Sequence, residues 1–319
     1  MPIGKTVVAA SGLRKSYGSR LVVDGVSLKV KAGEVIGLLG PNGAGKTTTL
    51  SILATLLAPD AGDISIAGIT PRDPRALRRK LGFVPQAIAL YPALSALRNL
   101  QFFARIHGLG KRDARDESMR VLEEVGLTQR AHDAVAVLSG GMQRRLNLAC
   151  GMVHRPEVLL LDEPTVGVDP QSRERILLTV RCAAEAGAAV IYSTHYMDEV
   201  ERLCDGVLLI DRGRLMANGT VAEIIVLGGR QPRMEITFQR RPSPGWCDGL
   251  RGVNELAPAD GDGKAALELA SLAQVSELLE QARARGGQVL EFSVHSPNLS
   301  DAFIALTGHA LREPGPEAR

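Results

Sequence analysis

A glycine-rich loop at residues 40–47 has the residue types and the spacing of a site for a triphosphate. It lies between an apolar run that predicts a buried strand and a run that predicts a helix, whose free N–H groups attract anions. The glycines let the backbone curve around phosphate oxygens, Lys46 supplies a mobile cation, and the hydroxyl of Thr47 can ligate Mg²⁺. The positions that we expect to hold the nucleotide in this loop are Asn42, Gly43, Gly45, Lys46, Thr47 and Thr48.

Two adjacent carboxylates, Asp162 and Glu163, end a second apolar run, which we interpret as a buried strand over residues 158–163. A strand that only builds a core would avoid them, because burying an unpaired carboxylate is costly. The first acid can hold Mg²⁺ through water, and the second can polarise or deprotonate an attacking water molecule. The pair therefore indicates hydrolysis of the bound triphosphate.

A second small-residue turn, at residues 138–143, leads into another helical pattern and again presents a helix N-terminus to an anion. Its Ser139, Gly140 and Gly141 are the candidate contacts. One triphosphate does not easily occupy two such sites on one subunit. We therefore expect this turn to serve the nucleotide of a second copy in a two-fold dimer.

Three further residues complete an ordered set: Gln86 and His195, each directly after an apolar run, and Asp169. With them, residues 1 to about 225 resemble the nucleotide-binding domain of an ABC transporter. The resemblance implies that Tyr17 stacks on adenine and that Gln86 bridges Mg²⁺ and a membrane subunit. It also implies that the loop of Asp169 touches the opposite protomer and that His195 senses the γ-phosphate.

The same resemblance assigns the chemistry and the fold. The expected catalytic residues are Lys46, Gln86, Glu163 and His195, and the expected metal ligands are Thr47, Gln86 and Asp162. The implied fold is an α/β P-loop NTPase with a parallel-sheet core, an inserted helical subdomain and a small C-terminal α/β domain. Met142 stands where many members carry Gln, which puts a side-chain contact there in doubt. The run after Met142 is also similar to the branch of drug-resistance and lipid exporters.

Composition and periodicity divide the chain into an ATP-binding domain at 1–228 and a second domain at 229–319. Helical spacing at about 87–137 predicts the inserted arm, which in the family meets the membrane subunit. Past residue 228, strand, helix and strand patterns predict a small α/β sandwich of split βαβ type. This unit has no catalytic cluster, so we expect it to be regulatory or dimer-supporting, and we expect residues 311–319 to fray.

The 319 residues are 45% hydrophobic, yet no segment approaches the ~20 consecutive apolar residues of a membrane span. The path through the membrane is therefore expected from a separate permease. The first residues lack a secretory signal, so we expect the protein on the cytoplasmic side of the membrane. Four scattered cysteines argue against a zinc site or a disulfide framework. A net charge of +3 gives no case for a nucleic-acid partner.

We therefore interpret the chain as the ATPase subunit of an exporter, with ATP and Mg²⁺ bound between two copies. An importer ATPase is the nearest alternative, although sugar-type importers carry a larger, β-rich tail. A DNA-maintenance ATPase would need a long coiled-coil insertion, and sustained heptads are absent. A translation factor would usually carry two such heads, whereas the chain has one phosphate loop.

Overall fold

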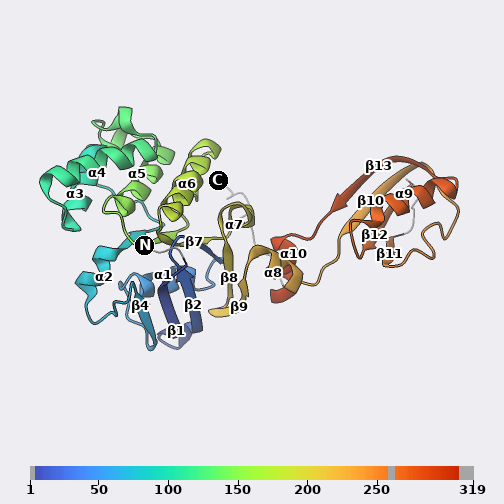
Figure 1. The fold of residues 1–319 in the computed structure, drawn as a ribbon, viewed down its shortest axis with the longest axis horizontal. Coiled ribbons are helices and arrows are strands. Elements are labelled where there is room, and N and C mark those ends of the chain that lie inside the picture. Colours follow the sequence, from blue (N-terminus) through green and yellow to red (C-terminus); the bar gives the residue numbers. More distant parts are fainter. Residues whose placement is uncertain (1–3, 258–262, 309–319) are drawn as a thin grey trace. The chain divides into compact units, whose positions relative to one another are not determined.

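The computed structural model describes residues 4–257 and 263–308, so the expectation for residues 311–319 lies outside the described part (Figure 1). The chain forms two compact units, the first running to Val221 and the second beginning at Ala222. This division falls slightly ahead of the expected boundary at 228. Among the described residues, no helix is both long and apolar enough to cross a membrane.

A six-stranded sheet forms the centre of the first unit, and its strands run parallel except for the last. Every residue of four of its strands is buried, so the apolar runs of the sequence reflect a sheet covered on both faces. Parallel strands end at the same edge, and that edge carries the phosphate loop and the two acids. In spatial order the strands are β5 (Leu81–Val84), β6 (Val158–Asp162), β7 (Ala189–Thr194), β3 (Val35–Leu39), β8 (Gly206–Asp211) and β9 (Arg214–Gly219).

Helices connect these strands, and several of them begin at, or directly after, a residue that the sequence suggests for function. The phosphate-loop helix starts at Lys46, the helix after the second small-residue turn at Gly140, and a third at Pro170, next to Asp169. This placement brings helix N-termini to the functional edge. The helices of the core are α1 (Lys46–Leu53), α2 (Pro74–Lys80), α5 (Gly140–Met152), α6 (Pro170–Glu185) and α7 (Met197–Leu203).

The first unit also contains a separate antiparallel sheet, which the sequence analysis did not expect. Its strands are β1 (Thr6–Tyr17), β2 (Arg20–Lys31) and β4 (Ala61–Ile66), in the order β2-β1-β4. The long hairpin of β1 and β2 contains several register shifts, which interrupt the alternation that signals a strand.

The inserted arm is helical, as expected, and lies between β5 and α5 (green in Figure 1). It consists of α3 (Ala96–Ile106), α4 (Lys111–Glu124) and two short 3₁₀ turns. Ser95 caps α3 by accepting a hydrogen bond from the Arg98 N–H at 3.3 Å. The buried side chains of α4 recur at helical spacing, at Ala114, Ser118, Val121 and Leu122.

The second unit contains a four-stranded antiparallel sheet, with the order β11-β12-β10-β13. Strands β12 and β13 both pair with β10, one on each side, and α9 connects them. This is the split βαβ arrangement that the sequence predicts; β11 was missed. The elements are α8 (Val221–Leu227), β10 (Arg233–Arg240), β11 (Val253–Ala257), β12 (Lys264–Leu269), α9 (Gln274–Ala284), β13 (Gln288–His295) and α10 (Leu299–Thr307).

Candidate functional site

The phosphate loop is held so closely by neighbouring backbone that two of its glycines have no room for a side chain. A Cβ at Gly40 would lie 2.2 Å from the Ile210 carbonyl oxygen, and one at Gly45 would lie 2.6 Å from the Val22 carbonyl oxygen. Gly45 also has a φ of 102°, which L-residues rarely adopt. Within the described part of the chain no side chain caps α1, so its first N–H groups can bind phosphate.

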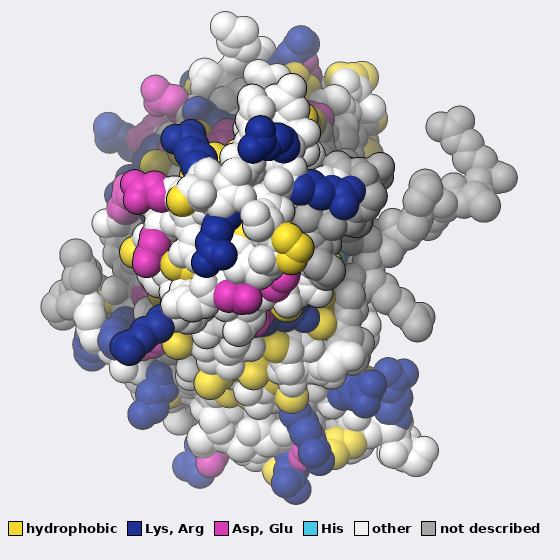
Figure 2. Space-filling model, turned by 90° about the vertical axis from the view of Figure 1, so that its right-hand side faces the viewer, with side chains coloured by type: hydrophobic (Ala, Val, Ile, Leu, Met, Phe, Trp, Pro, Cys, Tyr) yellow, Lys and Arg dark blue, Asp and Glu magenta, His cyan; other side chains and the backbone are white. Residues whose placement is uncertain are grey.

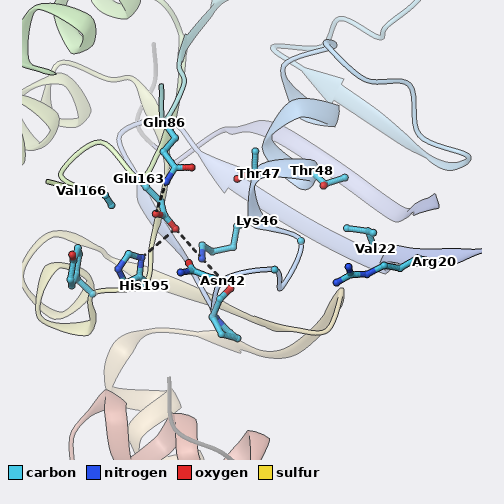
Figure 3. Close-up of a pocket in the computed structure, with 14 residues that line it drawn as sticks. Arg20, Val22, Asn42, Lys46, Thr47, Thr48, Gln86, Glu163, Val166 and His195 are labelled. Carbon is cyan, nitrogen blue, oxygen red and sulfur yellow. Dashed lines mark hydrogen bonds and ion pairs between the residues drawn. The ribbon is translucent and has the colours of Figure 1, made fainter. Parts of the chain in front are cut away.

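A cavity of about 510 Å³ opens beside this loop (Figure 3). It brings together Gln86, Glu163 and His195, which follow three different strands, with the expected residues of the phosphate loop. Outside the phosphate loop, the sequence analysis missed four of the residues that line it. These are Arg20, Val22, Val166 and Tyr196.

Three polar side chains converge on Glu163 (Figure 3). Lys46 Nζ lies 3.1 Å from Oε1, and His195 Nδ1 lies 3.3 Å from the same oxygen. The amide of Gln86 donates a hydrogen bond to Oε2 at 3.3 Å. Lys46 also donates to the carbonyl oxygen of Gly40 at 2.7 Å, so the cation lies between the loop and the acid. The His195 contact is a close approach whose angle is not that of a hydrogen bond.

Glu163 is ionised in this setting. Burial raises the pKa of its carboxyl group, but the neighbouring imidazole of His195 and the charge of Lys46 outweigh burial and hold the pKa below its ordinary value. A carboxylate that stays ionised at neutral pH can accept a proton from water. The electrostatics therefore keep this carboxylate free of a proton, as a proton acceptor must be, while the same neighbours make it a weaker base than an isolated glutamate.

The backbone of Glu163 differs from the expected strand. Strand β6 ends at Asp162, and Glu163 has a φ of 46°, which is uncommon for a residue with a side chain. Its N–H donates to the carbonyl and the hydroxyl oxygen of Ser193, both at 3.1 Å. This strained turn directs the carboxylate out of the sheet and into the cavity, and such strain concentrates at functional sites.

Asp162 is buried and accepts a hydrogen bond from Ser193 Oγ at 2.7 Å. Thr47 is exposed at the cavity, so its hydroxyl is free to meet an ion. The described residues contain no cluster of three or more His, Cys, Asp or Glu side chains that could hold a metal alone. This sparse donor set fits Mg²⁺, which keeps several waters and binds through one or two protein oxygens together with substrate phosphates.

Arg144 of α5 connects two loops that line the cavity. Its guanidinium donates to the carbonyl oxygen of Gln86 and, at 3.2 Å, to that of Val166. Burial lowers the pKa of this guanidinium. The helix that follows the second small-residue turn is thus bonded to the loop that carries Gln86, although 58 residues separate the two partners.

A fully buried carboxylate, Glu199, supports the loop of His195 from behind. It accepts hydrogen bonds from Tyr192 Oη at 2.8 Å and Thr194 Oγ1 at 2.9 Å, and its other oxygen pairs with Arg173 Nε at 2.6 Å. Thr194 Oγ1 in turn accepts the N–H of Tyr196 at 3.0 Å. Glu199 therefore ties α6 to both sides of His195.

The second small-residue turn does not line the cavity. Ser139 caps α5 by accepting the Met142 N–H at 3.3 Å, and Gly140 is exposed. Gly141 packs against the start of α6, where Asp169 accepts the Ser172 N–H at 2.9 Å. That hydrogen bond holds the pKa of Asp169 below its ordinary value. The second small-residue turn and Asp169 thus form a surface at the N-termini of α5 and α6, separate from the phosphate loop.

Tyr17 is 53% exposed and does not line the cavity. It is the cross-strand partner of Arg20, which does line it, at the turn between β1 and β2. The hairpin therefore places an exposed aromatic ring beside the site. Its expected stacking on adenine stays a prediction, as do the roles of the other site residues.

Comparison with known proteins places this geometry in a family. The family model described as "ABC transporter" matches residues 23–166. A linearmycin resistance ATP-binding protein of Bacillus subtilis is 40% identical over 96% of this chain and 100% of its own length. A Nod factor export ATP-binding protein of Ralstonia nicotianae is 38% identical over 98% of this chain and 97% of its own.

A solved structure agrees with these matches. An ATP-binding subunit of an ABC transporter, 31% identical, aligns with a TM-score of 0.65 over 70% of this chain and 94% of its own. The aligned part fits an ATP-binding unit, and the rest of this chain fits a further unit attached to it.

Proposed function

Because the chain belongs to the ABC transporter family of ATP-binding proteins, we propose that it is the ATP-hydrolysing subunit of an exporter that drives a separate permease. The convergence of Lys46, Gln86 and His195 on Glu163 carries this proposal, since it supplies a cation, two polar contacts and an ionised base beside a phosphate loop. The names of the relatives, which concern drug resistance and Nod factor export, favour export over import.

In the proposed reaction, water attacks the γ-phosphorus of ATP, and the bond to the bridging oxygen of ADP breaks. Glu163 accepts a proton from the attacking water, while Lys46 and the N–H groups of α1 offset the charge of the phosphates. His195, which lies 3.3 Å from Glu163 Oε1, would sense the γ-phosphate. Mg²⁺ when bound neutralises phosphate charge, and Thr47, Gln86 and Asp162 are its expected contacts.

A second copy completes the site in this proposal. The N–H groups of Gly140 and Gly141 would face the γ-phosphate held by the phosphate loop of the other copy, with Ser139 and Asp169 beside them. Because these contacts exist only when two copies close on ATP, binding favours the closed dimer and hydrolysis removes that bias.

The permease would dock where the helical arm meets the core, on the cytoplasmic side of the membrane. A groove of about 280 Å³ lies there, and its lining includes Leu56 and Ile106, which are 61% and 62% exposed. Next to it, the rings of Tyr91 and Phe102 meet edge to face at 4.9 Å and remain partly exposed. Exposed apolar groups of this kind mark protein interfaces.

One face of the molecule can be compared with the surfaces that bind nucleic acids. On the face drawn in Figure 2, Lys and Arg side chains are interspersed with Asp, Glu and apolar side chains. Nucleic-acid binding typically needs basic residues clustered on one surface.

The test of the proposed function is Glu163→Gln, which keeps the shape of the side chain but cannot accept the proton. We expect ATP affinity to stay within a few-fold of wild type, while turnover falls by about 10²–10⁴-fold. ATP affinity and ATPase rate are measured on the same preparation. Glu157→Gln, next to β6 at its opposite end, is the matched control and should keep wild-type turnover. A Glu163→Gln rate within about tenfold of wild type would remove Glu163 from the role of base.

A further inference from the structure

Strand β13 forms a free edge of the sheet in the second unit. The strand order is β11-β12-β10-β13, so among the described strands β13 pairs with β10 alone (Figure 1). The edge is eight residues long, whereas β11 at the opposite edge has five. Its pairing with β10 is regular from Glu291 to His295 and slips at Val289.

This edge lacks the features that normally prevent edge-to-edge pairing. Protected edges carry Lys, Pro or several charges. Between Gln288 and His295 there is no Lys, Arg or Pro and one carboxylate, Glu291. The strand also exposes large apolar side chains, with Leu290 67% and Phe292 45% exposed. A strand of this kind favours pairing with another strand.

The two faces of residues 291–295 differ in character. Phe292 and Val294 are the cross-strand partners of Ile236 and Met234 of β10, so they lie on the face of the sheet that carries these buried residues. Val294 packs against the core cluster, whereas Phe292 at the edge stays 45% exposed. The other face carries Glu291, Ser293 and His295, with Ser293 Oγ 3.2 Å from His295 Nε2.

We propose that residues 291–295 pair antiparallel with the same residues of a second copy, about a two-fold axis at Ser293. In this register Phe292 lies opposite the partner's Val294, and Glu291 lies opposite the partner's His295. Apolar side chains meet apolar side chains, and the one carboxylate meets an imidazole instead of another carboxylate. Such cross-strand pairs stabilise a sheet, whereas like charges placed opposite each other destabilise it.

The pairing joins two four-stranded sheets into one sheet of eight strands. A contact of five residues per copy is far smaller than a standard interface of about 800 Å² per partner, so the association is weak. It needs no nucleotide. Where two copies already meet at the ATP site, this contact raises the effective concentration of one β13 edge near the other. The second unit then supports the dimer.

The first test measures self-association of the full chain without nucleotide, by sedimentation velocity over a range of protein concentrations. We expect reversible dimers. Ser293→Lys, which sets two like charges opposite each other, should raise the dissociation constant by about fivefold or more. Leu256→Lys on β11, at the opposite edge, is the matched control and should leave the dissociation constant unchanged. Absence of dimers, or equal weakening by both variants, overturns the proposal.

The second test checks the register and remains informative if Ser293→Lys disturbs the fold. Of the four native cysteines, Cys182 is the exposed one, so Cys182→Ser provides the background. Ser293→Cys should form an intermolecular disulfide under mild oxidation without nucleotide, because residues directly opposite have Cβ atoms about 4.5–5.5 Å apart. Leu256→Cys should not. Equal cross-linking at both positions, or none at Ser293→Cys, overturns the register.

These readouts separate the edge contact from the ATP-dependent dimer. In the presence of ATP and Mg²⁺, Glu163→Gln should give dimers through the nucleotide site whether or not Ser293→Lys is also present. If Glu163→Gln does not form that dimer, the result contradicts the proposed function and leaves the pairing of β13 untouched. If the dimer without nucleotide is absent, the result contradicts the pairing of β13 and leaves the proposed function untouched.

Discussion

In the proposed function, Lys46 is the residue whose partners nucleotide binding would change. Its ammonium group is buried and is shared among the carbonyl oxygens of Gly40 and Pro41 and the carboxylate of Glu163. A phosphate in the loop would compete with Glu163 for this cation. The acid would then be released toward the attacking water, so binding and activation of the base are linked through one side chain.

Two ion pairs join α6 to α7, one buried and one exposed, and the buried pair contains Glu199. Glu199 of α7 is buried and pairs with Arg173 of α6, whereas Glu174 of α6 pairs with Arg202 of α7 at the surface. Burial lowers the pKa of Arg173, but the charge of Glu199 outweighs burial and raises it. Glu199 also accepts the hydroxyl of Thr194, and the oxygen of that hydroxyl accepts the N–H of Tyr196, so the network reaches both sides of His195.

We expect Glu199→Ala to lower the free energy of unfolding by about 3–5 kcal/mol, since it leaves a partly buried charge and two hydroxyls without their partner. Glu174→Ala should cost about 1 kcal/mol or less, because exposed pairs contribute little. Urea unfolding of both variants measures the difference. Equal effects would mean that the Glu199 network does not hold the loop of His195.

At the scale of elements, the contact between α5 and α6 depends on one glycine. A Cβ at Gly141 would lie 2.4 Å from Asp169 Oδ2 and from Ser172 Oγ, whereas a Cβ at Gly140 would meet nothing within 4 Å. Both glycines lie in the first turn of the same helix. They are therefore a matched pair for asking whether the two helix N-termini must touch.

Gly141→Ala should lower the free energy of unfolding by about 1–3 kcal/mol, because the added methyl group pushes the two helices apart. It should also reduce ATP-stimulated dimerisation, while ATP binding to the phosphate loop persists. Gly140→Ala should leave the unfolding free energy unchanged or raise it by about 0.4–1 kcal/mol. Thermal or urea unfolding ranks the two variants, and the opposite ranking would contradict the packing argument.

A stacked pair of imidazoles links α3 to the segment after α5. The rings of His107 and His154 lie 3.6 Å apart with planes 6° from parallel, and His154 Nε2 lies 3.1 Å from the Leu81 carbonyl oxygen. Burial, followed by the neighbouring His107, lowers the pKa of His154 to about 4 from 6.5. Burial also lowers the pKa of His107. Both rings are therefore neutral in the folded protein at physiological pH.

Because the folded pKa of His154 is depressed, its contribution to stability is intact above pH 6.5 and is lost as the pH falls toward about 4. We expect this residue to make the wild type about 2 kcal/mol less stable at pH 5 than at pH 7.5. His154→Gln keeps a donor for Leu81 and does not titrate, so this part of the pH dependence should disappear. His132→Gln, at an exposed position, is the control. An unchanged pH slope in His154→Gln would refute the assignment.

At the scale of the whole molecule, the two units divide at Val221, inside the region that the sequence assigned to the ATP-binding domain. Helix α8 therefore belongs to the second unit, apart from its first residue. Its Ile224 is buried, and a Cβ at Gly228 would lie 2.5 Å from the Ala302 Cα. A cut after residue 228 would retain α8 but remove the α10 residues that Gly228 packs against.

A chain ending at Thr220 should stay folded and bind ATP with an affinity within a few-fold of the full chain, since all residues of the cavity precede that point. A chain ending at Gly228 should bind ATP equally well but self-associate more, because α8 is left uncovered. ATP affinity, thermal unfolding and light scattering compare the two. A folded chain ending at Thr220 that no longer binds ATP would place part of the nucleotide site in the second unit.

The sequence by itself determined the parts of this protein whose geometry is local. The strand, loop and helix around Lys46, the buried strand that ends at the two acids, the helical arm and the split βαβ order were predicted correctly, because turn chemistry and hydrophobic periodicity act over a few neighbouring residues. The end of β6 was placed one residue late, since no local signal announces the positive φ of Glu163.

Only the tertiary structure decided which distant residues meet. Arg20 reaches the cavity through a hairpin whose bulges obscure its alternation, and Arg144 bonds the Gln86 loop from 58 residues away. In the sequence, Glu199 has the pattern of an ordinary exposed carboxylate on a helix. Packing alone makes it the buried partner of Arg173 and Tyr192. Contacts of this kind depend on how helices and sheets pack on each other, which local propensity does not specify.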